Sequence, residues 1–176
     1  MTDQPLAQSK APGGAHHLLS RLVGEWEGQT RTWFEPGQLA EESSSRGVIR
    51  PLLGGRFIRY EYQSTLNGEP FEGLFIFGYN LGSGKYEATW IDTFHMATGM
   101  MFSEGVGTET GFAVLGSWDP GEGPRWGWRT EVEIINANQI VFTAYVITPE
   151  GEESKGVETI YRRVGLSAPA APVPRE

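Results

Sequence analysis

Apolar and polar residues alternate along most of the chain, with the period of two that is typical of β-strands. The alternation is clearest in residues 56–64 and 85–93. The side chains expected to face the interior are Ile58, Tyr60 and Tyr62 in the first segment, and Tyr86, Ala88, Trp90 and Asp92 in the second. The pattern predicts half-buried strands that carry phenols and one carboxylate inward.

Turn signals divide the chain at intervals too short for helices. Asn67-Gly68 is the clearest, because both central residues of a type I′ hairpin need positive φ and this dipeptide supplies them. Between the turns we expect about ten strands, at 25–34, 41–50, 56–66, 69–79, 85–93, 99–107, 112–118, 126–135, 139–148 and 154–163. The chain is therefore expected to be all-β, folded as an antiparallel up-and-down barrel.

One segment near the start has helical spacing instead. In residues 15–23 four apolar side chains share one face, and Gly24 ends the segment. We expect a short helix that closes one end of the barrel. His16 and His17 lie at its start, where a solvated helix terminus is expected.

The length fits a single barrel domain, which we expect at residues 14–164. Residues 1–13 and 165–176 have no apolar periodicity, and the second segment contains Ala-Pro repeats. Both segments are expected to be disordered tails.

Composition narrows the classes of partner and compartment. The net charge of −8 opposes a phosphate backbone and an anionic membrane surface, so we expect neither nucleic acid nor membrane as a partner. No apolar run approaches the roughly 20 residues that span a bilayer. Cysteine is absent, and the start has no apolar core of a secretory signal. These features predict a cytoplasmic protein.

Gly24-Glu25-Trp26 opens the predicted barrel, and Tyr161-Arg162-Arg163 ends it. An arginine from the last strand can lie across the face of a tryptophan on the first strand and join the two ends of the sheet. We therefore expect Gly24 and Trp26 to close the barrel together with Arg162 or Arg163.

This pairing is similar to the structural signature of calycins, the superfamily of lipocalins and fatty-acid-binding proteins. Further segments resemble a bacterial family described only as a domain of unknown function, over most of residues 18–163. They are Gly24-Glu-Trp26-Glu-Gly28 with Pro36, Leu53-Gly54-Gly55-Arg56-Phe57, Gly68-Glu-Pro-Phe71-Glu-Gly73, Gly78-Tyr79 and Trp90-Ile-Asp92. The resemblance implies a lipocalin-like barrel with an internal cavity, and it brings no catalytic residue.

The first segment also looks like nitrobindins, whose ten-stranded barrels hold haem through a histidine. The chain departs from their pattern at Thr30, where they carry a second glycine. Haem bound through His95, with thioethers from Met96, Met100 and Met101 beside it, is one reading of the sequence. The other reading is that these methionines fill an irregular cavity.

Asp92 and His95 lie close together at a predicted strand end, where a barrel mouth would be. They could form an acid–base pair. Two ligands fall short of the three or four of a typical zinc site, so no metal site is predicted. The alternative is a carboxylate that bonds backbone amides beside a surface imidazole.

Aromatic side chains predict a cavity for a hydrophobic or amphipathic ligand. The candidate ligand-binding residues are Tyr60, Tyr62, Trp90, Asp92, His95, Met100, Phe102 and Trp128. Ligand binding is thus the leading hypothesis. A calycin-type enzyme that uses Asp92, His95 and a tyrosine is the second, and a filled barrel with a structural role is the third. The run 71–79 is apolar on both faces, which suggests a strand covered on the outside by a loop, a tail or, in a homodimer, a second protomer.

Overall fold

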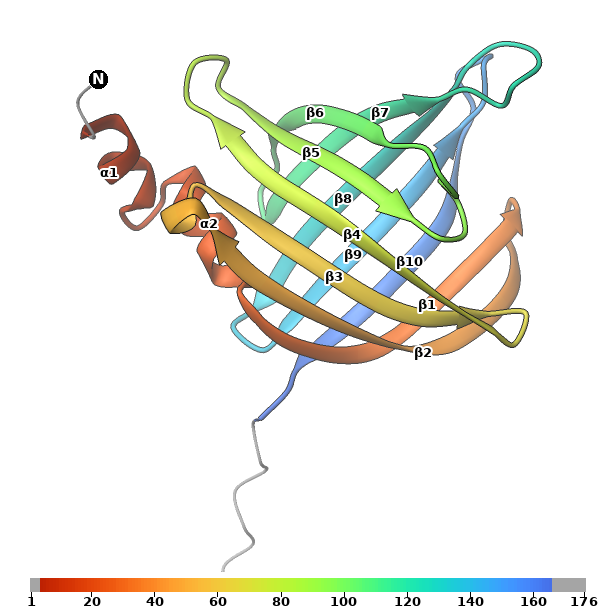
Figure 1. Ribbon diagram of the computed structural model, residues 1–176, viewed down its shortest axis with the longest axis horizontal. Coiled ribbons are helices and arrows are strands. Elements are labelled where there is room, and N and C mark those ends of the chain that lie inside the picture. The colour runs from red at the N-terminus through yellow and green to blue at the C-terminus, as the bar shows by residue number, and fades with distance from the viewer. Residues whose placement is uncertain (1–3, 166–176) are drawn as a thin grey trace, which may run out of the picture.

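The computed structural model describes residues 4–165, which form a closed barrel of ten antiparallel strands (Figure 1). The strands are β1 (Gly24–Glu35), β2 (Gln38–Leu52), β3 (Phe57–Leu66), β4 (Glu69–Asn80), β5 (Lys85–Asp92), β6 (Met101–Gly107), β7 (Gly111–Trp118), β8 (Trp126–Asn136), β9 (Gln139–Ile147) and β10 (Glu153–Arg163). Each strand pairs with its neighbours in sequence, and β1 also pairs with β10. The predicted all-β, ten-stranded up-and-down barrel is confirmed.

Two helices precede the barrel, α1 (Gln4–Lys10) and α2 (Ala15–Leu22), and Figure 1 shows α2 at one end of it. Leu19 and Leu22 of α2 are buried in the barrel core. The indole Nε1 of Trp26 donates to the carbonyl of Leu22 at 2.9 Å. The apolar face of α2 therefore closes this end of the barrel, where the sequence predicted a short helix.

Helix α1 lies in the segment that was expected to be disordered. Lys10 Nζ donates to the carbonyl of Gly54 at 2.5 Å, and the hydroxyl of Ser9 lies 2.7 Å from Nδ1 of His16. His16 is 3% exposed and packs edge-on against Tyr79, so the expectation that it is solvated was wrong. The contacts of Lys10 with Gly54 and of His16 with Tyr79 join residues that are far apart in the sequence. The local pattern of apolar residues therefore does not predict them. Residues 166–176 of the predicted C-terminal tail lie outside the described range.

The barrel closes beside Trp26. The guanidinium carbon of Arg163 lies 4.2 Å from the centre of the indole ring. Arg163 also donates to the carbonyls of Val23, Arg21 and Ala137, at 2.6, 3.0 and 2.9 Å. The neighbouring Arg162 is exposed, because alternation along β10 turns it outward.

Aromatic rings fill the middle of the barrel. Phe75 stacks on Phe77 and Trp90, with ring centres 4.9 and 5.3 Å apart, and Tyr60 stacks on Phe142 at 4.5 Å. Stacked rings therefore make up much of the barrel core.

The outer face of β4 carries apolar side chains, and Ile76 is among the exposed large ones. Further exposed apolar side chains on the neighbouring strands are Ile91, Phe102 and Leu115. A homodimer that covers this strand stays a prediction.

Candidate functional site

A cavity of about 60 Å³ lies inside the barrel. Its walls combine aromatic rings with threonine side chains. The rings belong to Tyr60, Tyr62, Phe71, Phe75, Trp90, Trp128 and Phe142, and the threonines are Thr30, Thr32, Thr130, Thr143 and Thr159. The lining is completed by Ala144, Val157 and His95, the last from the loop between β5 and β6. The cavity is larger than the ~10–15 Å³ that one water needs, and well below the ~300 Å³ of pockets for drug-sized ligands.

The loop of residues 93–100 follows Asp92, the last residue of β5, and Figure 1 shows it away from the α2 end. The side chain of Asp92 is fully buried. Its Oδ1 accepts from the backbone N–H of Met96 at 2.6 Å, and its Oδ2 lies 2.6 Å from Nδ1 of His95. A carboxylate that bonds groups three and four residues onward is a local motif that holds a loop without secondary structure. Asp92 therefore fixes both the loop and the imidazole.

The bond from Asp92 decides which nitrogen of His95 is available. A carboxylate accepts only, so Nδ1 carries the proton and the lone pair of the neutral ring is on Nε2. The imidazole ring lies 5.5 Å from the ring centres of both Trp90 and Trp128. His95 also contacts the rings of Phe71 and Phe94. Aromatic packing on several sides holds it in one orientation.

Tyr62 connects the same carboxylate to Trp90. The indole Nε1 of Trp90 donates to the phenol oxygen of Tyr62 at 2.9 Å. Burial raises the pKa of Tyr62 well above its ordinary value, and the negative charge of Asp92 raises it further. The phenol is therefore held protonated, and it acts as a hydrogen-bonding group beside Asp92.

Trp128, a residue of the cavity wall, has a buried hydrogen-bond donor without an acceptor. The residue is 7% exposed, and within residues 4–165 its buried indole Nε1 has no hydrogen-bond partner. Buried polar groups in folded proteins are nearly always paired. By contrast, the hydroxyls of Thr30 and Thr159 bond each other at 2.8 Å. The unpaired N–H is thus the group in the wall that most needs an acceptor.

The structure brings together most of the residues chosen from the sequence. The cavity is lined by Tyr60, Tyr62, Trp90, His95 and Trp128. Asp92 orients His95 through the hydrogen bond to Nδ1. Met96 is partly buried against the core.

Two candidates were wrong. Met100 is 71% exposed and Phe102 is 57% exposed. β6 begins at Met101, which pairs with Trp90 and is buried, so Phe102 points outward opposite Thr89. A shift of one residue exchanges the two faces of a strand.

Sequence reasoning missed the threonine part of the wall, together with Phe75 and Phe142. A signal was present for β1, because Trp26, Thr30 and Thr32 alternate along one face of the strand and are all buried. Extending the alternation from Trp26 would have placed both threonines inside.

In the described part of the chain, the surroundings of His95 are not arranged to hold a metal ion or haem. Within residues 4–165 no group of three or more His, Asp or Glu side chains is arranged to hold a metal ion. The aromatic rings around His95 leave a space of about 60 Å³, which is too small for a porphyrin. The exposed Met100 does not contribute to it.

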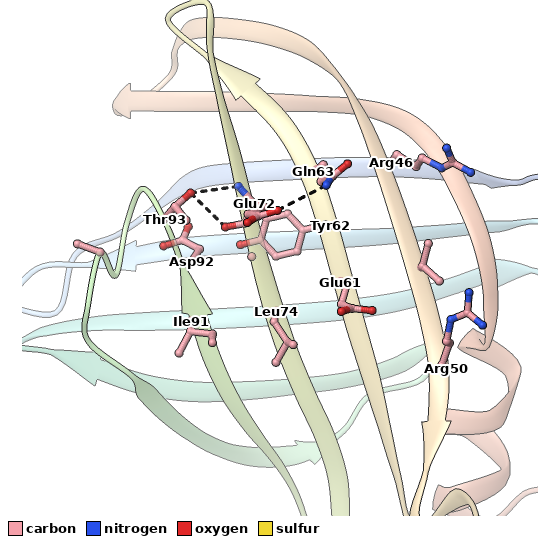
Figure 2. A pocket seen from close by; sticks show the side chains of 13 residues that line it. Arg46, Arg50, Glu61, Tyr62, Gln63, Glu72, Leu74, Ile91, Asp92 and Thr93 are labelled. Carbon is pink, nitrogen blue, oxygen red and sulfur yellow. Dashed lines mark hydrogen bonds between the residues drawn. The ribbon is translucent and has the colours of Figure 1, made fainter.

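A wider groove of about 620 Å³ runs over β2 to β5 (Figure 2). Figure 2 shows Arg46 and Arg50 on one side of it, and Leu74 and Ile91 on the other. The groove is open to solvent, and its Arg46 forms an exposed ion pair with Glu25 of the kind that contributes little stability. Tyr62 lines both the groove and the cavity.

The sequence matches the family described as "Protein of unknown function (DUF1579)" over residues 11–163. The chain belongs to this family. The match confirms the predicted membership of an uncharacterised family. Among curated protein sequences, none matches the chain significantly.

Two solved structures are similar in fold to this DUF1579 protein. Rv2717c from M. tuberculosis has a TM-score of 0.59 at 15% identity, with 87% of this chain and 98% of the other covered. The S-type phycobiliprotein lyase CPES from Guillardia theta has a TM-score of 0.56 at 14% identity, with 84% and 90% covered. Within residues 4–165, no helix has the length and apolar character needed to cross a bilayer.

Proposed function

We propose that this DUF1579 barrel binds a small amphipathic molecule, or one end of a larger one, in the cavity beside His95. The observation that carries the proposal is the unpaired indole N–H of Trp128, buried in a residue of the cavity wall. An oxygen of a ligand would supply the missing acceptor, because leaving a buried donor unpaired costs about 1–3 kcal/mol.

The rest of the wall favours the same kind of ligand. Aromatic rings such as Trp90 and Phe75 offer apolar contact, and Thr32 and Thr130 add small polar groups. A mainly apolar lining with a few oriented polar groups is typical of small-molecule sites. The similar structure from Guillardia theta is named a phycobiliprotein lyase, so a protein with this fold can act on a small molecule. At 14% identity the similarity does not identify a ligand for this chain.

The volume limits how a ligand is held. About 60 Å³ takes a group of only a few heavy atoms. A longer molecule would have to displace the loop 93–100. The side chains of Phe94 and Met100 in this loop are already exposed to solvent. We therefore expect small acids and ketones to bind without rearrangement, and longer chains to bind only when the loop moves.

Native mass spectrometry tests the proposal. Gently purified protein is compared with denatured protein, and butanoic acid, hexanoic acid and butanone are then added in turn. The matched variants are Ala144→Val, which fills the cavity, and Ala113→Val on strand β7, which does not line it. An adduct that Ala144→Val loses and Ala113→Val keeps supports the interior site. Binding that is equal in both variants, or no adduct with any probe, would contradict it.

A further inference from the structure

We propose that the cavity is also an acid–base catalytic site, in which Nε2 of His95 removes a proton from a carbon next to a carbonyl group. The carbonyl oxygen is bound by the indole N–H of Trp128. The inference rests on the proposed function, since the substrate must first enter the cavity.

The first support is the way Asp92 holds His95. A fully buried carboxylate bonded at 2.6 Å to Nδ1 fixes the tautomer in which Nε2 is the base. It also stabilises the imidazolium that forms when Nε2 takes a proton.

The second support is the closeness of His95 to the residue that carries the unpaired donor. The rings of His95 and Trp128 lie 5.5 Å apart, and both residues line the cavity. A general base and a hydrogen-bond donor on one small cavity can act on the two ends of a C–C=O unit. The donor is already desolvated, so it needs no reorganisation when charge develops on the oxygen.

The walls and the volume define the class of substrate. About 60 Å³ enclosed mainly by aromatic rings suits a small uncharged ketone or aldehyde, or the carbonyl end of a larger one. The phenol of Tyr62 already accepts from Trp90 and lies beside Asp92. Tyr62 therefore helps to hold Asp92 and His95, so Tyr62 and Asp92 are both positioning residues.

The step needs no further reactant. The lone pair of Nε2 takes the proton, the C–H bond breaks, and its electron pair forms a C=C bond while the carbonyl becomes an enolate. The N–H of Trp128 bonds the enolate oxygen, and the carboxylate of Asp92 lies against the imidazolium. Return of the proton to the same carbon, or to a conjugated one, regenerates His95. The products are an exchanged or an isomerised carbonyl compound.

Proton exchange is measurable with simple probes. Butanone and cyclopentanone are incubated with the protein in deuterium oxide, and the loss of their α-proton signals is followed by NMR. We expect exchange that falls roughly 100-fold in His95→Gln. We expect a fall of about tenfold or more in Trp128→Phe, which keeps an aromatic side chain but removes the N–H. His17→Gln, on helix α2, is the matched control and should exchange like the parent protein.

Asp92→Asn tests the positioning role. It should lower the exchange rate and also move the pH profile of exchange, which a merely structural change would not do. Binding of the same ketones is measured separately by saturation-transfer NMR, and the fold of each variant by circular dichroism. Binding without exchange, or exchange unchanged in folded His95→Gln or Trp128→Phe, would overturn the catalytic inference and leave the proposed function standing. Absence of binding by any ketone would also overturn the catalytic inference, and binding of butanoic or hexanoic acid by native mass spectrometry would still support the proposed function.

Discussion

The phenol of Tyr62 lies directly over Gly73 on the neighbouring strand. A Cβ added to Gly73 would come within 2.2 Å of the phenol oxygen and ring, which is closer than any real contact. The two residues are partners in the β3–β4 ladder, and Asp92 is the partner of Gly73 on β5. Glycine at this position thus leaves room for the phenol to reach Trp90 and Asp92.

We expect Gly73→Ala to displace Tyr62 and to break its 2.9 Å bond from Trp90. Forcing a methyl group into this packed site should cost about 1–3 kcal/mol of unfolding free energy. Urea unfolding measures the cost, and the indole N–H resonance of Trp90 reports the broken bond. Gly107→Ala is the control, because its added Cβ would meet nothing closer than 3.7 Å. An unmoved Trp90 resonance in Gly73→Ala would refute the role given to Gly73.

The contact between Arg163 and Trp26 predicts how the barrel closure responds to mutation. Trp26→Ala removes a fully buried indole and should cost roughly 3–5 kcal/mol. Arg163→Lys keeps the charge but loses the planar fork that reaches several carbonyls, at a cost of about 1–3 kcal/mol. Arg162→Lys on the outer face should stay within about 0.5 kcal/mol. Equal effects of the two arginine substitutions in urea unfolding would contradict this account of the closure.

His16 predicts a loss of stability in acid. Burial lowers its pKa from the ordinary 6.5, and the charges of Lys10 and Arg56 lower it further, against a hydrogen bond that the ring donates to the backbone of Arg56, which raises it. Below about pH 6.5 the unfolded chain therefore binds more protons at this residue than the folded chain does. Its contribution to stability is present above this pH and is lost as the pH falls through the folded value.

Thermal melts across this range check the prediction about His16. His16→Gln should flatten the acid decrease in melting temperature. His17→Gln on the same helix controls for the loss of a histidine and should keep the decrease. The same acid decrease in His16→Gln as in the parent protein would show that other groups cause it.

Alternation and turn chemistry were enough to predict the barrel. Period-two patterns such as that of β3 identify the buried face wherever a strand stays regular, and the dipeptide Asn67-Gly68 fixes a hairpin. The failures lie where these rules do not apply. The loop 93–100 has no period, so the starting residue of β6, and with it the face of Phe102, could not be assigned.

The candidate site was predictable only in part. Asp92 and His95 are close in sequence, and a carboxylate that bonds residues three and four positions onward is a local motif, so their pairing could be proposed. The unpaired N–H of Trp128 and the docking of His16 against Tyr79 depend on strands distant in sequence. Only the closed barrel brings them together.

The indole N–H resonances of the protein test the central claim most directly. The peak of Trp128 is assigned by its loss in Trp128→Phe, and spectra are recorded as hexanoic acid is added. The account predicts a downfield shift of the Trp128 peak as its N–H gains an acceptor, while the peak of Trp26, already bonded to Leu22, stays in place. A Trp128 peak that does not move while the methyl groups of Leu74 and Ile91 shift would place binding in the outer groove and contradict an interior site.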